Sequence, residues 1–134
     1  MNNKTIFDEI VIPYHIMNSD EDQTVVIDLG VGCTRKGELI IYAEYTDYEN
    51  PRYDCVTWVT LSNSEARRLA RRLDVSFVKL PVLISDSMDE WGYIVNPTLT
   101  QVRDCFKEIT ECLLDEGSRF RIHRTIGYRN FICC

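Results

Sequence analysis

The side chains best suited to chemistry in this chain are six cysteines and two histidines. A thiol held beside an imidazole is a nucleophilic pair in many enzymes, and only His15 and His123 can supply the imidazole. His15 follows Tyr14 at the end of an expected strand, and His123 lies in an alternating basic segment. Both positions favour a surface or hydrogen-bonding role. The sequence therefore assigns no catalytic residue and favours a protein that does not catalyse a reaction.

The sequence also lacks the usual ligand sets for metals and phosphates. A structural zinc site needs four ligands at characteristic spacing, and no Cys-x-x-Cys pair is present. Asp86, Asp89 and Glu90 cluster, but their spacing is not that of a calcium-binding EF-hand loop. The segment Gly30-Val31-Gly32 leads into another expected strand, not into a helix whose N-terminus would receive a phosphate. We therefore expect no metal and no cofactor.

Aromatic and acidic residues share two expected loops, and this pairing is typical of a recognition surface. Tyrosine and tryptophan offer a large contact area at low entropic cost, and neighbouring carboxylates suit a basic partner. The alternative is that the rings fold onto the core and the acids only keep the loops soluble. The candidate partner-binding residues are Tyr45, Asp47, Tyr48, Glu49 and Tyr53 in the first loop, and Asp89, Glu90, Trp91 and Tyr93 in the second.

These loops must be held by regular elements, and the clearest element is a long helix from Asn96 to Gly117. Asn96 is expected to cap it, Pro97 to take its first position and Gly117 to stop it. At about 100° per residue, one arc of this helix is apolar and must face a core. That arc holds Leu99, Val102, Phe106, Ile109 and Leu113, with Cys105 and Cys112 on its flank.

The opposite arc of the long helix is acidic. It holds Asp104, Glu108, Glu111 and Asp115, and we call these four residues the acidic rail. Like charges four residues apart destabilise an isolated helix by a few tenths of a kcal/mol, roughly, for each pair. The rail is either a solvated face or a surface that meets an oppositely charged partner, such as another protein or a second copy of this chain.

A shorter helix is expected from Ser62 to about Asp74, with Ser62 and Glu65 as a capping box. Its exposed side carries the arginine ridge, which we define as Arg67, Arg68, Arg71 and Arg72. A second basic stretch follows the long helix and includes Arg119, Arg121 and Arg124. The ridge with Arg119 and Arg121 is an alternative anion-binding site, for example for nucleic acid. The sequence pI of about 4.9 argues against a polyanionic partner.

Strands are expected on both sides of these helices. Six segments have the residue pattern of strands: Thr5–Ile12, Thr24–Val31, Glu38–Tyr45, Cys55–Leu61, Phe120–His123 and Ile126–Cys133. Residues 75–84 are also expected to be extended, although Pro81 would interrupt the hydrogen bonding of a central strand. The connections are short enough for hairpins. The sequence therefore predicts an α+β fold: a mostly antiparallel sheet of about five to six strands, with one short and one long helix packed on one face.

Composition is that of one folded domain. Apolar residues make up 45% and charged residues 27% of the chain, and the net charge is -6. We expect a single domain over residues 1–134, with cysteines that are reduced and mostly buried. Asp8 and Glu9 interrupt the first apolar run, unlike a signal peptide, and no segment approaches about 20 consecutive apolar residues. We therefore expect a cytoplasmic protein without a membrane-spanning segment.

Three functions are compatible with these features. The leading hypothesis is a small acidic binding module, of inhibitor, antidote (immunity) or adaptor type, that docks without catalysis on a basic protein surface. The second is a small-molecule sensor, or an enzyme using a cysteine and His123, with a pocket between the sheet and the long helix. In that case the C-terminal arginines would hold an anionic ligand. The third is nucleic-acid binding through the arginine ridge.

Overall fold

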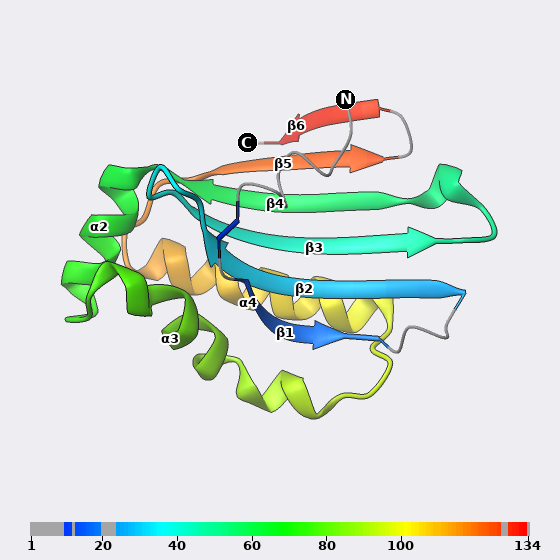
Figure 1. Cartoon of the computed structure of the whole chain (residues 1–134), viewed down its shortest axis with the longest axis horizontal. Helices are drawn as coiled ribbons and strands as arrows, with labels where there is room; N and C mark the ends of the chain where they lie inside the picture. Colours follow the sequence, from blue (N-terminus) through cyan, green and yellow to red (C-terminus); the bar gives the residue numbers. More distant parts are fainter. Residues whose placement is uncertain (1–9, 12, 20–23, 127–128, 134) are drawn as a thin grey trace.

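A computed structural model describes residues 10–11, 13–19, 24–126 and 129–133. Its described strands form one antiparallel sheet with the order β1-β2-β3-β4-β5-β6 (Figure 1). The strands are β1 (Tyr14–Asn18), β2 (Val25–Cys33), β3 (Leu39–Asp47), β4 (Cys55–Leu61), β5 (Arg121–Ile126) and β6 (Arg129–Cys133). The helices α2 (Asn63–Arg72), α3 (Leu80–Ser87) and α4 (Leu99–Asp115) lie between β4 and β5 in the chain. The chain thus has the predicted α+β fold, and neighbouring strands follow one another in sequence.

The predicted strands between residues 24 and 61 agree closely with β2, β3 and β4, whereas β5 runs on to Ile126, which the sequence prediction assigned to the last strand. β2 and β3 form the predicted hairpin, with Cys33 opposite Leu39 and Gly37 in the left-handed region at φ 82°. The predicted first strand, Thr5–Ile12, lies mostly outside the described residues. Within it, Ile10 bridges to Thr34, and the Val11 N–H donates to the Cys33 carbonyl at 2.8 Å. β1 follows these residues, and the sequence analysis expected only the end of a strand there, at Tyr14 and His15.

Residues 75–84 correct the sequence prediction, because residues 77–84 are helical where an extended segment was expected. They form the short 3-10 helix η2 (Phe77–Lys79) and the start of α3. Pro81 stands in the first turn of α3, where its missing N–H is not needed. Leu80, Ile84 and Met88, spaced four residues apart, are buried against the core. This helical spacing was hidden by the many other apolar residues of the segment.

The start of α4 is also corrected. The N-cap is Thr98 and not Asn96, and Leu99 is the first helical residue. The Thr98 hydroxyl accepts the Gln101 N–H at 3.1 Å, and the Gln101 side chain accepts the Thr98 N–H at 2.8 Å. Asn96 has a φ of 52°, so its backbone is left-handed and turns the chain before the helix. The predicted stop at Gly117 is confirmed by its φ of 76°.

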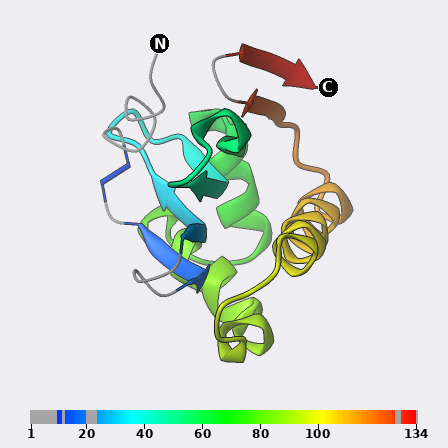
Figure 2. The same cartoon turned by 90° about the vertical axis from the view of Figure 1, so that its right-hand side faces the viewer.

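The main core lies between the sheet and the helices, which gather on one side of it (Figure 2). Leu29, Ile41 and Val59 from the central strands are fully buried there with Leu69 of α2 and Ile109 of α4. A smaller cluster on the opposite face joins Ile10, Ile40 and Tyr42, with Trp58 packed against it. Within the described residues, no helix is both long enough and apolar enough to cross a bilayer.

Candidate functional site

A cavity of about 680 Å³ opens between α4 and strands β3, β4 and β5. α4 packs over β2 and β3, so the helix-facing side of β4 and β5 is left partly uncovered. Leu99 and Phe106 belong to the predicted apolar arc of α4, but the sheet buries them only partly. Together with Ile122 of β5 they form an apolar wall. The volume is within the range of about 300–1,000 Å³ that small-molecule sites occupy.

Cationic side chains also line this cavity: Arg103 and Lys107 come from α4, and Arg124 comes from β5. Arg124 is half-buried, and its Nε donates to the Thr57 hydroxyl at 3.3 Å across the β4–β5 pair. Glu44 also lines the cavity, but it lies directly opposite Asp28 in the sheet, and the alternation of β3 directs its carboxylate to the other face. The cavity therefore joins an apolar wall to a positively charged edge, in a chain whose net charge is negative.

The thiol of Cys55 lines the same cavity. Burial raises its pKa, whereas Arg124 and Arg103, which line the same cavity, oppose that increase. His123 is on the other face of the sheet, stacked on Trp58 with ring centroids 5.1 Å apart. Cys55 therefore has no imidazole partner among the described residues, and the geometry gives no support to a pair with His123.

The other described thiols are not activated either. Burial raises the pKa of Cys33 to about 11, and burial with Glu108 and Glu90 raises that of Cys105 to about 12. Cys112 is exposed, and its pKa is also raised, by burial and by the carboxylates of α4. Cys33, Cys55, Cys105 and Cys112 are free. A nucleophilic thiol normally has a lowered pKa, so this set lacks the usual electrostatic activation.

The first predicted loop, between β3 and β4, holds its aromatic residues in different environments. Tyr45 is half-buried against the core, whereas Tyr48 and Tyr53 are 66% and 59% exposed, and Tyr53 also lines the cavity. Asp47 shapes the loop, because its Oδ1 accepts the N–H groups of Glu49 and Asn50, each at 3.0 Å. The loop thus presents two tyrosines to solvent from a turn braced by Asp47.

The second predicted loop is in fact helical at its centre, as the 3-10 helix η3 (Asp89–Tyr93). Asp89 and Glu90 are exposed, and Tyr93 is 84% exposed. Trp91 is half-buried against the core, and its Nε1 donates to Glu108 Oε2 at 3.2 Å. This contact joins the second loop to the acidic rail and turns one of its rings inward.

The acidic rail is only partly free. Glu108 accepts the Trp91 hydrogen bond, and Glu111 lies 3.9 Å from Lys107. Asp104 and Asp115 are exposed and make no ion pair among the described residues. Two of the four predicted rail residues therefore have internal partners.

The arginine ridge also has internal partners. Arg72 Nε lies 3.2 Å from Glu116, so α2 meets the C-terminal end of α4. Arg67 donates to Asn63 and lies over the Phe77 ring, and Arg68 is 3.9 Å from Glu65. Arg71, Arg119 and Arg121 are exposed and make no ion pair among the described residues.

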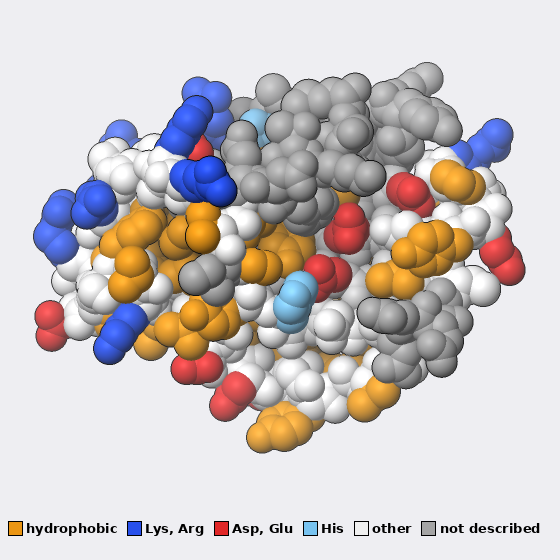
Figure 3. Space-filling view, viewed as in Figure 1, with side chains coloured by type: hydrophobic (Ala, Val, Ile, Leu, Met, Phe, Trp, Pro, Cys, Tyr) orange, Lys and Arg blue, Asp and Glu red, His pale blue; other side chains and the backbone are white. Residues whose placement is uncertain are grey.

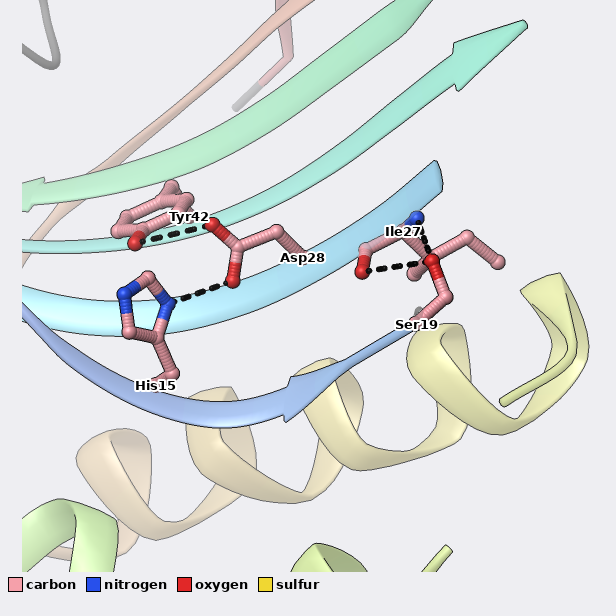
Figure 4. A network of polar contacts seen from close by, with 5 residues as sticks. All are labelled: His15, Ser19, Ile27, Asp28 and Tyr42. Carbon is pink, nitrogen blue, oxygen red and sulfur yellow. Dashed lines mark hydrogen bonds and ion pairs between the residues drawn. The ribbon is translucent and has the colours of Figure 1, made fainter. Parts of the chain in front are cut away.

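One polar network was missed by the sequence analysis. Asp28 on β2 makes polar contacts with His15 of β1 and Tyr42 of β3, on the face of the sheet opposite the helices (Figure 4). His15 Nδ1 is 2.8 Å from its Oδ1, and the Tyr42 hydroxyl donates to its Oδ2 at 3.4 Å. Burial and the Asp28 carboxylate also raise the pKa of Glu44, which lies directly opposite Asp28. The alternation of β2 places Asp28 on this face, but only the strand register brings His15 and Tyr42 to it.

The described residues do not bring three His, Cys, Asp or Glu side chains together in a way that would hold a metal ion. The structure thus offers one cavity with mixed apolar and cationic lining, a polar network on the opposite face, and exposed tyrosines at two loops. Comparison with known proteins adds no relative: no family model, curated protein sequence or solved structure matches this chain.

Proposed function

We propose that this protein binds a small anionic molecule with an apolar body in the cavity between α4 and the sheet. The observation that carries the proposal is the convergence of Arg103, Lys107 and Arg124 on an apolar wall. An apolar wall favours burial of a hydrocarbon or aromatic group, and the guanidinium groups favour a carboxylate at its end. A ligand with only one of these parts would leave half of the lining unused.

Arg124 is the residue expected to position the anionic group. Its hydrogen bond to Thr57 restrains the guanidinium, so less side-chain entropy is lost when it binds a carboxylate. Arg103 comes from α4 and lines the same cavity as Arg124. Phe106 and Leu99 then contact the apolar part of the ligand.

A fluorescence titration tests this proposal. Anilinonaphthalene sulfonate combines an aromatic body with an anionic group and brightens when it leaves water. We expect saturable binding that decanoate displaces. Arg124→Gln should weaken binding about tenfold, since a charged hydrogen bond contributes about 1.5–3 kcal/mol. Lys79→Gln removes one exposed positive charge far from the cavity and should bind as the original chain does.

A second variant tests the apolar wall. Thr110 lines the cavity from α4 and is half-buried, so Thr110→Trp should fill space in the cavity and abolish the fluorescence increase. Thermal unfolding of each variant reports whether it is folded. The proposal fails if folded Arg124→Gln and Thr110→Trp both bind the dye with unchanged affinity, or if decanoate does not compete.

The leading sequence hypothesis, docking on a basic protein without catalysis, is our second candidate. It is favoured by the exposure of Tyr48, Tyr53 and Tyr93, because large exposed rings beside carboxylates commonly mark binding surfaces. Its test is capture of partners from the lysate of the native host by immobilised protein. A basic protein retained by the original chain and lost by the Tyr48→Ala, Tyr93→Ala double variant would support docking. Equal retention of the basic protein by the original chain and by the double variant would rule out docking through these tyrosines.

A further inference from the structure

A second cavity, of about 660 Å³, opens on the sheet face opposite the helices, and two stacked rings line it. Trp58 on β4 is directly opposite His123 on β5, with an interplanar angle of 17°. Burial and the neighbouring Arg121 lower the pKa of His123, which favours the neutral form of its ring. Aromatic rings on adjacent strands of a sheet are the kind of surface on which nucleic-acid bases stack.

Two arginines line the same cavity. Arg119 and Arg121 are exposed, and neither makes an ion pair with another described residue. The cavity also contains Glu65 and Glu38, but both carboxylates have internal partners. Glu65 accepts the Arg119 N–H at 2.8 Å and lies 3.9 Å from Arg68, while Glu38 accepts the Thr34 hydroxyl at 3.3 Å. The guanidinium groups of Arg119 and Arg121 are therefore left to meet an external anion.

The positive charge extends beyond the cavity to one end of the molecule. The Asn63 side chain donates to the Lys36 carbonyl at 3.1 Å, which holds the β2–β3 turn, with Arg35 and Lys36, beside α2. Lys and Arg side chains gather over this end in the space-filling view, with Asp and Glu side chains among and below them (Figure 3). The net charge of -6 thus conceals a local basic surface next to the stacked rings.

We propose that this face binds single-stranded nucleic acid, with a base against the Trp58–His123 pair and phosphates over Arg119 and Arg121. Charge alone would suit an acidic polypeptide equally well. The adjacent stacked rings favour a nucleic acid, because base stacking on aromatic side chains is largely independent of sequence. This site is separate from the cavity under α4, so the two proposals stand or fall independently.

Fluorescence anisotropy with a short labelled oligouridylate tests whether Arg119 and Arg121 bind phosphates. We expect binding that weakens steeply between about 50 and 200 mM salt, because phosphate contacts release counterions. Arg121→Glu should weaken binding at least about tenfold. Arg52→Glu makes the same charge change in an exposed residue beside the opposite end of β4 and should leave the affinity within about twofold.

Tryptophan fluorescence tests whether a base stacks against Trp58. The chain has two tryptophans, so Trp91→Phe leaves Trp58 as the only one. We expect oligouridylate to quench the fluorescence of this variant and to leave that of Trp58→Phe nearly unchanged. The proposal is overturned if the original chain shows no anisotropy change, or if Arg121→Glu and Arg52→Glu bind alike. Equal affinity for polyglutamate of matched charge, without Trp58 quenching, would overturn it in favour of an acidic polypeptide.

Discussion

Tyr42 on β3 lies directly opposite Gly30 on β2, and its hydroxyl extends across that glycine to reach Asp28. A Cβ atom on Gly30 would lie 2.5 Å from the Tyr42 hydroxyl oxygen and 2.7 Å from its ring carbon Cζ. The absence of a side chain at residue 30 is therefore a condition for the contact between Tyr42 and Asp28. Gly30 is also opposite His15, the other partner of Asp28.

Gly30→Ala should destabilise the protein, because the buried Tyr42 ring cannot move away without disturbing the cluster it shares with Ile40. Overpacking of this kind costs about 1–3 kcal/mol. Urea unfolding measures the loss. In a Tyr42→Leu background the same substitution should cost clearly less, since the ring that it meets is gone. Equal losses in both backgrounds would show that Tyr42 is not the residue that excludes the methyl group.

Glu108→Ala and Glu111→Ala should differ in their effect on stability, although both residues belong to the acidic rail. Glu108 accepts a hydrogen bond from the half-buried Trp91, and removing it leaves the indole N–H without that partner, at a cost of about 1–2 kcal/mol. Glu111 only approaches exposed Lys107 at 3.9 Å, so its loss should cost less than about 0.5 kcal/mol. Chemical unfolding of the two variants compares them directly. Equal stabilities would contradict a structural role for Glu108.

The sequence predicted the elements whose patterns are unambiguous. α4 was found from its apolar arc and its stop at Gly117, and β2 to β4 were found from apolar runs separated by short turns. α3 was missed because Val75, Phe77, Val78 and Val82 are typical of strands, and Pro81 conceals a helix start. Burial of Leu80 and Ile84 decides the conformation, and this burial depends on tertiary packing that the local pattern does not contain.

The candidate site was less accessible to sequence reasoning. A pocket between the sheet and the long helix, with C-terminal arginines, was among the alternatives, but its lining depends on which strands α4 covers. Arg124 and His123 are neighbours in sequence and lie on opposite faces of β5, so only one of them reaches the cavity. The His15–Asp28 pair joins residues 13 positions apart through strand register, which no short motif indicates.

Thiol labelling should separate the described cysteines by burial. Cys105 is fully buried and its pKa is about 12, so it should resist iodoacetamide until the protein unfolds. Cys112 is exposed on the same helix and should react first, although slowly at neutral pH because its pKa is raised. Mass spectrometry of a Cys133→Ser, Cys134→Ser variant identifies the labelled residues. Rapid labelling of Cys55 at neutral pH would instead indicate a lowered pKa and would revive the enzyme hypothesis.

The stability of the fold should fall in mild acid, partly through His123. Burial and the nearby Arg121 lower its pKa in the folded state, so the unfolded chain binds the proton more readily. The stability that this residue contributes is therefore present above the unfolded pKa of about 6.5 and is lost as the pH falls through it towards the lower folded pKa. His123→Phe keeps a ring to stack on Trp58 but cannot titrate. Urea unfolding at about pH 7.5 and about pH 5.5 should show a smaller loss for this variant than for the original chain. An equal or larger loss in the variant would show that protonation of His123 is not unfavourable in the fold.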